Sequence, residues 1–187
     1  MPLLSSLEEL SLFKTNIDTL EGIGRFRLLK KVSLFRAGQL QQIDDVRALK
    51  NTLVSIEFDQ CKKIVSYEPL GELENLLRLV LFRCHAIESL HFIKRLERLE
   101  FLSFVGTDVL DGNLSPAFGI TYVGFNDKSH YSHSFKDFSA RGWNICLLDG
   151  EPAPKVIWPV NESSIIVSTA ACWARIIPLS AARKEIW

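Results

Sequence analysis

The chain has 187 residues, of which 47% are hydrophobic and 24% charged, and its 22 basic and 22 acidic side chains balance to a formal net charge of zero. This length fits one domain with at most a small appendage, and the composition excludes a disordered chain. Without an excess of positive charge, the chain lacks the electrostatic signature of a dedicated nucleic-acid or anionic-membrane binder.

The N-terminal sequence, "MPLLSSLEELSLF", has neither a basic start nor an unbroken apolar run before a cleavage site, so it predicts no secretory signal. The longest apolar stretch, residues 165–174, is too short to cross a bilayer. The four cysteines are not closely paired along the chain, which favours reduced thiols. We therefore expect a cytoplasmic protein without a membrane partner, unless the chain is a segment of a longer one.

A hydrophobic pattern repeats through the first two thirds of the chain. Each repeat opens as apolar-x-x-apolar-x-apolar, as in "LEELSL", "LKKVSL", "LVSIEF", "LLRLVL", "LEFLSF" and "ITYVGF". Alternation between the fourth and sixth positions is typical of a strand with one buried face. The six repeats begin at Leu7, Leu29, Leu53, Leu76, Leu99 and Ile120, and their predicted inward pairs are Leu10/Leu12, Val32/Leu34, Ile56/Phe58, Leu79/Leu81, Leu102/Phe104 and Val123/Phe125.

After each strand, apolar residues recur at every third position, as in Ile87, Leu90, Ile93 and Leu96. A spacing of three favours short 3₁₀ segments, because their side chains eclipse at i and i+3. One such repeat cannot bury its own apolar face, so neighbouring repeats must stack.

The pattern and its period resemble the leucine-rich repeat family, and the short repeats are similar to its 22-residue-type class, common in bacterial and protein-phosphatase-regulator-like members. The resemblance implies an α/β solenoid: a curved leucine-rich repeat with a parallel concave β-sheet and a 3₁₀ or irregular convex side. It also implies an interaction scaffold that binds another protein, because most members of the family act in this way.

The ninth position of each repeat holds a small polar, thiol or methyl side chain. In the leucine-rich repeat family this side chain satisfies loop backbone groups where the strand ends, which Ala37 is unable to do. Cys61 and Cys84 should lie on adjacent strands about 4.8 Å apart, within reach of a disulfide, but a reducing compartment favours two buried thiols. The residues at this position are Thr15, Ala37, Cys61, Cys84 and Thr107.

Three segments are predicted. Residues 1–127 hold the repeats, with about six strands, and residues 128–150 form a C-terminal cap. The cap prediction rests on "DGNLSPAF" and "KSHYSHSF", which resemble the C-terminal ends of a set of bacterial leucine-rich repeat proteins of mostly unassigned function. Residues 151–187 are an atypical tail, either extra capping structure or a poorly ordered end. The first repeat has no polar N-terminal cap, which indicates either self-association or missing upstream sequence.

Side chains at the third, fifth and seventh positions should point to the open concave face. Three phenylalanines there, each beside a cation, form the candidate binding surface, because exposed aromatic patches commonly mark interfaces. The alternative is that the cap or tail covers this face, or that the phenylalanines pack on one another. The candidate partner-binding residues are Phe13, Lys14, Phe35, Arg36, Glu57, Asp59, Arg78, Phe82, Arg83, Phe101 and Tyr122.

Two other functions are weighed against protein binding. His130 and His133 form an H-x-x-H pair that offers a metal-binding or hydrolytic role, but the spacing is weakly specific and hydrogen bonding within the cap is favoured. The third hypothesis is a structural, self-associating module. Neither a phosphate-binding glycine loop nor a nucleophile–base pair is evident, so we expect no enzyme activity, no cofactor and no resident metal.

Overall fold

The computed structural model describes residues 6–139, 144–145, 164–166 and 176–178. They fall in two units, Met1–Ile145 and Cys146–Trp187. In the second unit, β8 (Ser164–Ile166) pairs antiparallel with β9 (Ile176–Pro178). The rest of the predicted tail, with its tryptophans, lies outside the described residues.

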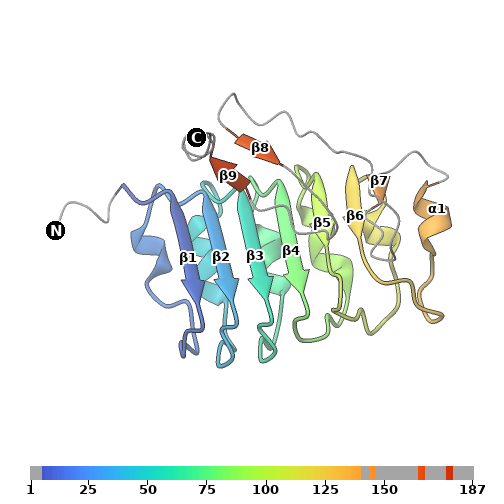
Figure 1. Ribbon diagram of the computed structural model, residues 1–187, viewed down its shortest axis with the longest axis horizontal. Coiled ribbons are helices and arrows are strands. Elements are labelled where there is room, and N and C mark those ends of the chain that lie inside the picture. The colour runs from blue at the N-terminus through green and yellow to red at the C-terminus, as the bar shows by residue number, and fades with distance from the viewer. Residues whose placement is uncertain (1–5, 140–143, 146–163, 167–175, 179–187) are drawn as a thin grey trace, which may run out of the picture. The chain divides into compact units, whose positions relative to one another are not determined.

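The first unit contains one sheet of seven parallel strands, arranged in chain order from β1 to β7 (Figure 1). Each predicted repeat supplies one strand, and the inward pairs of neighbouring repeats are in register, for example Leu10 with Val32. The fold is therefore a leucine-rich repeat solenoid, as predicted. The strands are β1 (Glu9–Phe13), β2 (Lys31–Phe35), β3 (Ser55–Asp59), β4 (Arg78–Phe82), β5 (Phe101–Ser103), β6 (Tyr122–Gly124) and β7 (Asn144–Ile145).

Strand β7 is one strand more than the repeats indicate. It lies in the segment predicted as a cap and pairs in parallel with β6, Tyr122 opposite Asn144 and Val123 opposite Ile145. The six-repeat register does not extend to it, because Gly142 replaces the apolar first position, but Ile145 and Leu147 lie 22 residues after Val123 and Phe125 and hold the fourth and sixth positions of a further repeat.

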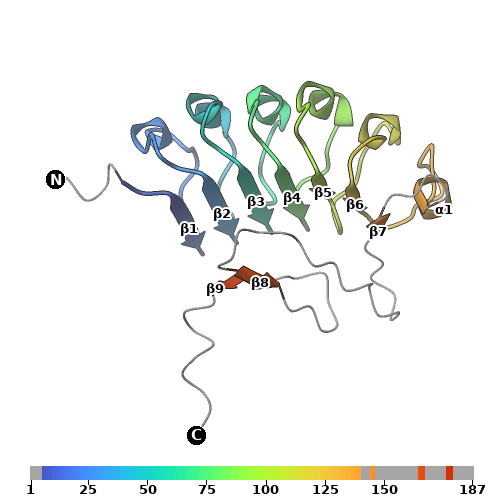
Figure 2. The same cartoon turned by 90° about the horizontal axis from the view of Figure 1, so that it is seen from above.

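Five 3₁₀ segments connect successive strands and lie side by side on one face of the sheet (Figure 2). The predicted spacing of three accounts for these 3₁₀ segments, because side chains three residues apart lie on the same side of a 3₁₀ turn and can pack on the core together. In the second repeat the buried residues at this spacing are Leu40, Ile43, Val46 and Leu49. The segments are η1 (Ile23–Arg25), η2 (Asp44–Leu49), η3 (Glu68–Glu72), η4 (Leu90–Arg95) and η5 (Ser115–Ala117).

The core lies between the sheet and the 3₁₀ segments. The predicted inward pairs are buried from the second repeat onward, and burying each such side chain contributes roughly 1.5–3 kcal/mol. We call one strand with its following 3₁₀ turn a rung. Leu10 and Leu12 are only half-buried, because among the described residues the first rung has a neighbour on one side alone. Aromatic rings fill the far end, where Phe104 and Phe125 stack with centroids 5.4 Å apart.

Ninth-position side chains bond to backbone groups at the strand ends in the third to fifth repeats, as predicted, whereas the buried Thr15 hydroxyl has no hydrogen-bond partner among the described residues. The Thr107 hydroxyl donates to the Leu81 carbonyl at 2.7 Å and accepts from the Cys84 amide at 2.9 Å. The Cys84 thiol donates in turn to the Phe58 carbonyl of the preceding rung at 3.3 Å. Cys61 and Cys84 are both free thiols, and their mutual hydrogen bond lowers the pKa of Cys61 and raises that of Cys84.

Aromatic side chains cover the last complete rung. Helix α1 (Phe135–Ser139) places the fully buried Phe138 ring 4.9 Å from Phe118 and 5.4 Å from Phe125, between ring centroids. Phe135 stacks on Phe125 at 4.4 Å. These contacts shield the exposed end of the apolar column formed by the rungs.

Hydrogen bonds hold the segment before α1 against the fifth repeat. His130 Nε2 lies 3.2 Å from the Val109 carbonyl oxygen, and the Tyr131 hydroxyl accepts from the Val109 amide at 3.2 Å. The Ser132 hydroxyl accepts from the Leu114 amide at 3.0 Å. The "HYSH" segment thus gives hydrogen-bond partners to backbone groups of the loop after β5, namely those of Val109 and Leu114, which lie outside the sheet.

The eighth residue of each of the first five repeats has a left-handed backbone, and in the first four repeats it directly follows the strand, whereas Gly106 lies three residues beyond Ser103, the last residue of β5. In the first four repeats its amide extends the sheet by donating to a carbonyl of the next repeat, as from Lys14 to Phe35 at 2.8 Å and from Arg36 to Asp59 at 2.7 Å, whereas the Gly106 amide donates to Asn126 Oδ1. This conformation costs a non-glycine residue roughly 1–2 kcal/mol. We call the five residues the left-handed row: Lys14 (φ 51°), Arg36 (56°), Gln60 (56°), Arg83 (49°) and Gly106 (70°).

Glycine substitutions test this strain. We expect Gln60→Gly to raise the free energy of unfolding by about 0.5–1 kcal/mol, because the relief of strain exceeds the entropy that glycine loses on folding. Gly106→Ala should lower the free energy of unfolding for two reasons. An ideal Cβ at this position lies 2.7 Å from Arg83 Cγ, and a φ of 70° is strained for alanine. Urea unfolding measures both. The control Gln41→Gly, at an exposed glutamine with negative φ, should be destabilising. A loss of stability in Gln60→Gly equal to the control's would contradict the assignment of strain.

Candidate partner-binding face

The face of the sheet opposite the 3₁₀ segments, the open face, carries the candidate residues in columns fixed by strand register. The seventh-position column contains Phe13, Phe35, Asp59 and Phe82, each opposite the next on adjacent strands. The third-position column ends in Arg78, Phe101 and Tyr122. Because parallel strands stand about 4.8 Å apart, neighbours in a column are in contact range.

The phenylalanines differ in exposure. Phe13 is 66% exposed, whereas Phe35 and Phe82 are half-buried, and the equivalent residue of the fifth repeat, Val105, is buried. The Phe13 and Phe35 rings stack with centroids 4.6 Å apart and planes 10° apart. The alternative that these side chains pack on one another therefore holds for this pair, and yet Phe13 keeps most of its surface exposed.

Arg78 lies between a carboxylate and an aromatic ring. Its Nη1 is 3.5 Å from Glu57 Oε2, and its guanidinium carbon lies 4.8 Å from the centroid of the Phe101 ring. Phe101 and Tyr122 continue the contact, with ring centroids 6.3 Å apart. Burial lowers the pKa of Arg78, and the Glu57 carboxylate opposes that shift. The result is a rigid, partly desolvated cation on the open face.

Asp59 interrupts the aromatic column. It stands opposite Phe35 on one side and Phe82 on the other, and its Oδ1 is buried without a hydrogen-bond partner among the described residues. An unsatisfied buried acceptor costs roughly 1–3 kcal/mol.

The cations beside the phenylalanines belong to the left-handed row. The Arg83 guanidinium carbon lies 4.1 Å from the centroid of the Phe82 ring. Lys14 and Arg36 are exposed, and no acidic side chain among the described residues comes within ion-pair distance of them. The sequence placed these residues beside the aromatic column but did not show their strained backbone. The only signal of it was the glycine at the equivalent position, Gly106.

The eleven predicted residues do not form one uniform stripe. The structure brings Phe13 into contact with Phe35, and Arg78 into contact with Glu57 and Phe101. These two groups lie at opposite ends of their strands, because seventh-position residues end the strands and third-position residues begin them. The contact of Arg78 with Phe101 joins two repeats and has no signature in either one alone.

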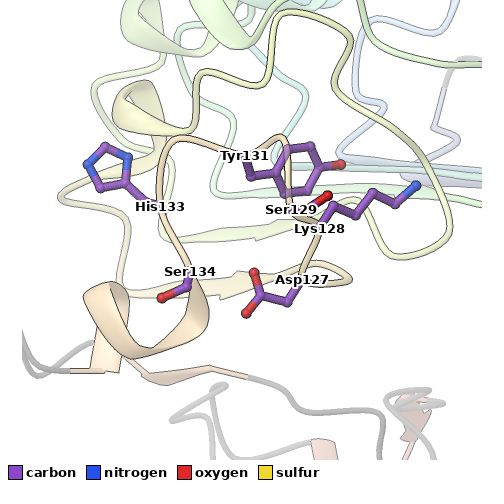
Figure 3. Close-up of a pocket in the computed structure, with 6 residues that line it drawn as sticks. All are labelled: Asp127, Lys128, Ser129, Tyr131, His133 and Ser134. Carbon is purple, nitrogen blue, oxygen red and sulfur yellow. The ribbon is translucent and has the colours of Figure 1, made fainter.

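The histidine pair lies beside a polar cavity of about 380 Å³ near α1, lined by Asp127, Lys128, Ser129, Tyr131, His133 and Ser134 (Figure 3). His133 stands across it from Lys128 in Figure 3, and its Nδ1 lies 2.8 Å from the Ser132 hydroxyl. The His130 ring contacts the Val109 carbonyl instead. In the part of the chain that the structure describes, no three His, Cys, Asp or Glu side chains group as metal ligands would.

The described residues include no helix of the length and apolar character needed to cross a membrane.

Comparison with known proteins gives only distant structural similarity. No protein-family model matches the chain, and no curated protein matches it in sequence. Internalin C2 from Listeria monocytogenes is 16% identical over 66% of this chain and 75% of its own, with a TM-score of 0.41. A leucine-rich repeat protein from Leptospira interrogans is 17% identical over 67% of this chain and 44% of its own, with a TM-score of 0.35. Such values carry no functional argument, and the repeat fold rests on the strand register itself.

Removing the Glu57 carboxylate tests how Arg78 is held. We expect Glu57→Gln to lower the free energy of unfolding by about 1 kcal/mol, because it leaves a half-buried cation without its counter-charge. The matched control is Glu8→Gln, whose partner pair with Lys30 has side chains 55% and 57% exposed and should contribute under about 0.5 kcal/mol. Urea unfolding of both variants makes the comparison. Equal, small effects would show that Phe101 alone holds Arg78.

Proposed function

We propose that this chain is a protein-binding module that engages a partner protein through its open face. The observation that carries the proposal is the Phe13 ring, which is 66% exposed, stacked on Phe35 and flanked by exposed cations that have no acidic partner among the described residues. Desolvating one phenylalanine contributes roughly 1.5–3 kcal/mol. Aromatic residues and arginine are also the types enriched at interaction hot spots.

The second group on the open face supports the same proposal. Arg78, Phe101 and Tyr122 present a fixed cation and two half-exposed rings, so little side-chain entropy is lost when a partner binds them. Rigid aromatic anchors are efficient for this reason. We keep Glu57 and Asp59 in the proposed surface as the acidic positions that a partner must complement.

The two alternatives to protein binding are metal binding by the histidine pair and self-association, and the experiment below distinguishes them. The histidine pair already serves the cap, since His130 contacts the Val109 carbonyl and His133 packs edge-on against Phe118 at 4.5 Å between centroids. Self-association is the second alternative, because the exposed Phe13 lies on β1, which pairs on one side only among the described residues.

The double variant Phe13→Ala/Phe35→Ala tests the proposal. Wild-type protein and the variant are used as bait in extracts of the source cells, and captured proteins are identified by mass spectrometry. We expect a protein captured by the wild type to be lost from the variant by at least tenfold, consistent with removal of two hot-spot rings. The melting temperature should fall only slightly, because Phe13 is mostly exposed and Phe35 half-buried.

The matched control is Val65→Ala/Leu110→Ala, which truncates side chains 74% and 64% exposed on loops rather than on the open face. It should capture the same protein as the wild type. Identical capture by all three proteins would contradict the proposal. Concentration-dependent light scattering abolished by the double variant would assign the surface to self-association, and stoichiometric zinc lost on His130→Ala would favour the metal-binding alternative.

A further inference from the structure

The left-handed row holds residues that are costly in its conformation. Glycine adopts a positive φ freely and asparagine does so with little strain, whereas a long side chain is disfavoured there. The fifth repeat uses glycine, at Gly106, yet three of the four preceding repeats place Lys14, Arg36 and Arg83 at the equivalent position. The left-handed backbone itself has a structural cause, because the amide at this position continues the hydrogen-bond ladder, so it is the long cationic side chains at these positions that call for an explanation.

The described structure gives Lys14 and Arg36 no compensating ion pair. Other basic residues find acidic partners, for example Lys30 with Glu8 at 3.0 Å and Arg95 with Glu68 at 2.6 Å. Lys14 and Arg36 are exposed, and no such ion pair includes them. Their charges are therefore available to a partner without first breaking a contact within the chain.

The side chain of Arg83 is held in place by its neighbours. Its guanidinium carbon lies 4.1 Å from the centroid of the Phe82 ring, and its Cγ lies where a side chain at position 106 would begin, 2.7 Å from an ideal Cβ. Glycine at position 106 thus leaves room for the Arg83 side chain. A cation fixed in this way loses little conformational entropy on binding an anion.

The cations form a line across the rungs. Lys14 and Arg36 follow directly paired residues on adjacent strands, about 4.8 Å apart, while Arg36 and Arg83 are two rungs, or about 9.6 Å, apart. The aromatic column of Phe13, Phe35 and Phe82 runs beside this line, one residue earlier in each strand. An extended peptide, with same-side residues about 6.6–6.8 Å apart, spans such a line and presents both acidic and apolar side chains to it.

We propose that the left-handed row and the aromatic column beside it bind an extended acidic and apolar segment of the partner protein. This inference rests on the proposed protein-binding function. Charge complementarity selects the acidic segment, and Asp59 selects against a continuous polyanion such as nucleic acid, because its carboxylate stands within the aromatic column between Phe35 and Phe82. The zero net charge of the chain also disfavours a nucleic-acid partner.

The test removes the charges without disturbing the backbone. In the variant Lys14→Asn/Arg36→Asn/Arg83→Asn, asparagine tolerates the left-handed conformation, so the melting temperature should stay the same or rise. The probe is a short fluorescein-labelled peptide of alternating Glu and Leu, titrated with the full chain by fluorescence anisotropy. We expect wild type to bind the probe, binding to weaken at high ionic strength, and the triple variant to lose affinity roughly tenfold.

Two variants and one peptide serve as controls. Arg27→Asn/Lys50→Asn/Lys94→Asn makes the same change in net charge at exposed sites outside the row and should bind the probe as wild type does. Gln60→Asn lies in the row but changes no charge, so it should also bind normally. A probe with Gln in place of Glu should bind wild type and the triple variant equally.

Several outcomes would overturn the inference. These are no binding of the Glu–Leu probe to wild type, equal binding by the triple variant, or binding independent of salt. Tighter binding of an oligothymidylate in the same titration, lost in the triple variant, would replace the acidic segment with nucleic acid. If the native partner is lost by Phe13→Ala/Phe35→Ala but kept by the triple variant, the proposed function stands and this inference fails. If neither variant loses the partner, the proposed function itself fails.

Discussion

Burial of the inward pair of each strand is the interaction on which the rest of the structure depends. One rung presents two apolar side chains and a 3₁₀ turn and cannot enclose them alone, so each rung is stabilised by its neighbours. The difference is visible within the chain: Leu10 and Leu12 of the first rung are half-buried, while Val32 and Leu34 of the second are fully buried. At the other end, the Phe138 ring takes the place of a neighbouring rung.

Stacking in register determines what the open face can present. Because inward residues lock the strands together, every outward side chain stands opposite its equivalent on the next rung, and contacts form between repeats rather than within them. The Phe13–Phe35 stack and the Arg78–Phe101 contact both arise in this way. The left-handed turn after each of the first four strands has the same origin, since it returns the chain toward the core while its amide continues the ladder.

The sequence predicted the elements that repeat and missed those that depend on contacts between repeats. The inward pairs and the 3₁₀ spacing recur along the repeats, so aligning the repeats reveals them, and the ninth-position side chains form their hydrogen bonds in the third to fifth repeats. Strand β7 was missed because its repeat is degenerate: Gly142 stands at the apolar first position, and only Ile145 and Leu147 keep the spacing of 22 residues from Val123 and Phe125. The positions of the site residues followed from that register, but the half-burial of Phe35 and the desolvation of Arg78 did not, since each depends on a side chain about one repeat away.

The open face carries opposing charges in successive repeats, which under the proposed function a partner would have to satisfy together. Lys14 and Arg36 favour anions at one end, whereas Asp59, one rung further, holds a buried oxygen without a donor among the described residues. A uniformly acidic ligand gains at the first two rungs and meets repulsion at the third, while an apolar ligand leaves all three charges desolvated and unpaired. The repeats thus place a positive, a positive and a negative side chain at three successive strand ends, and under the proposed function this order would select a ligand as much by the mismatches it penalises as by the contacts it offers.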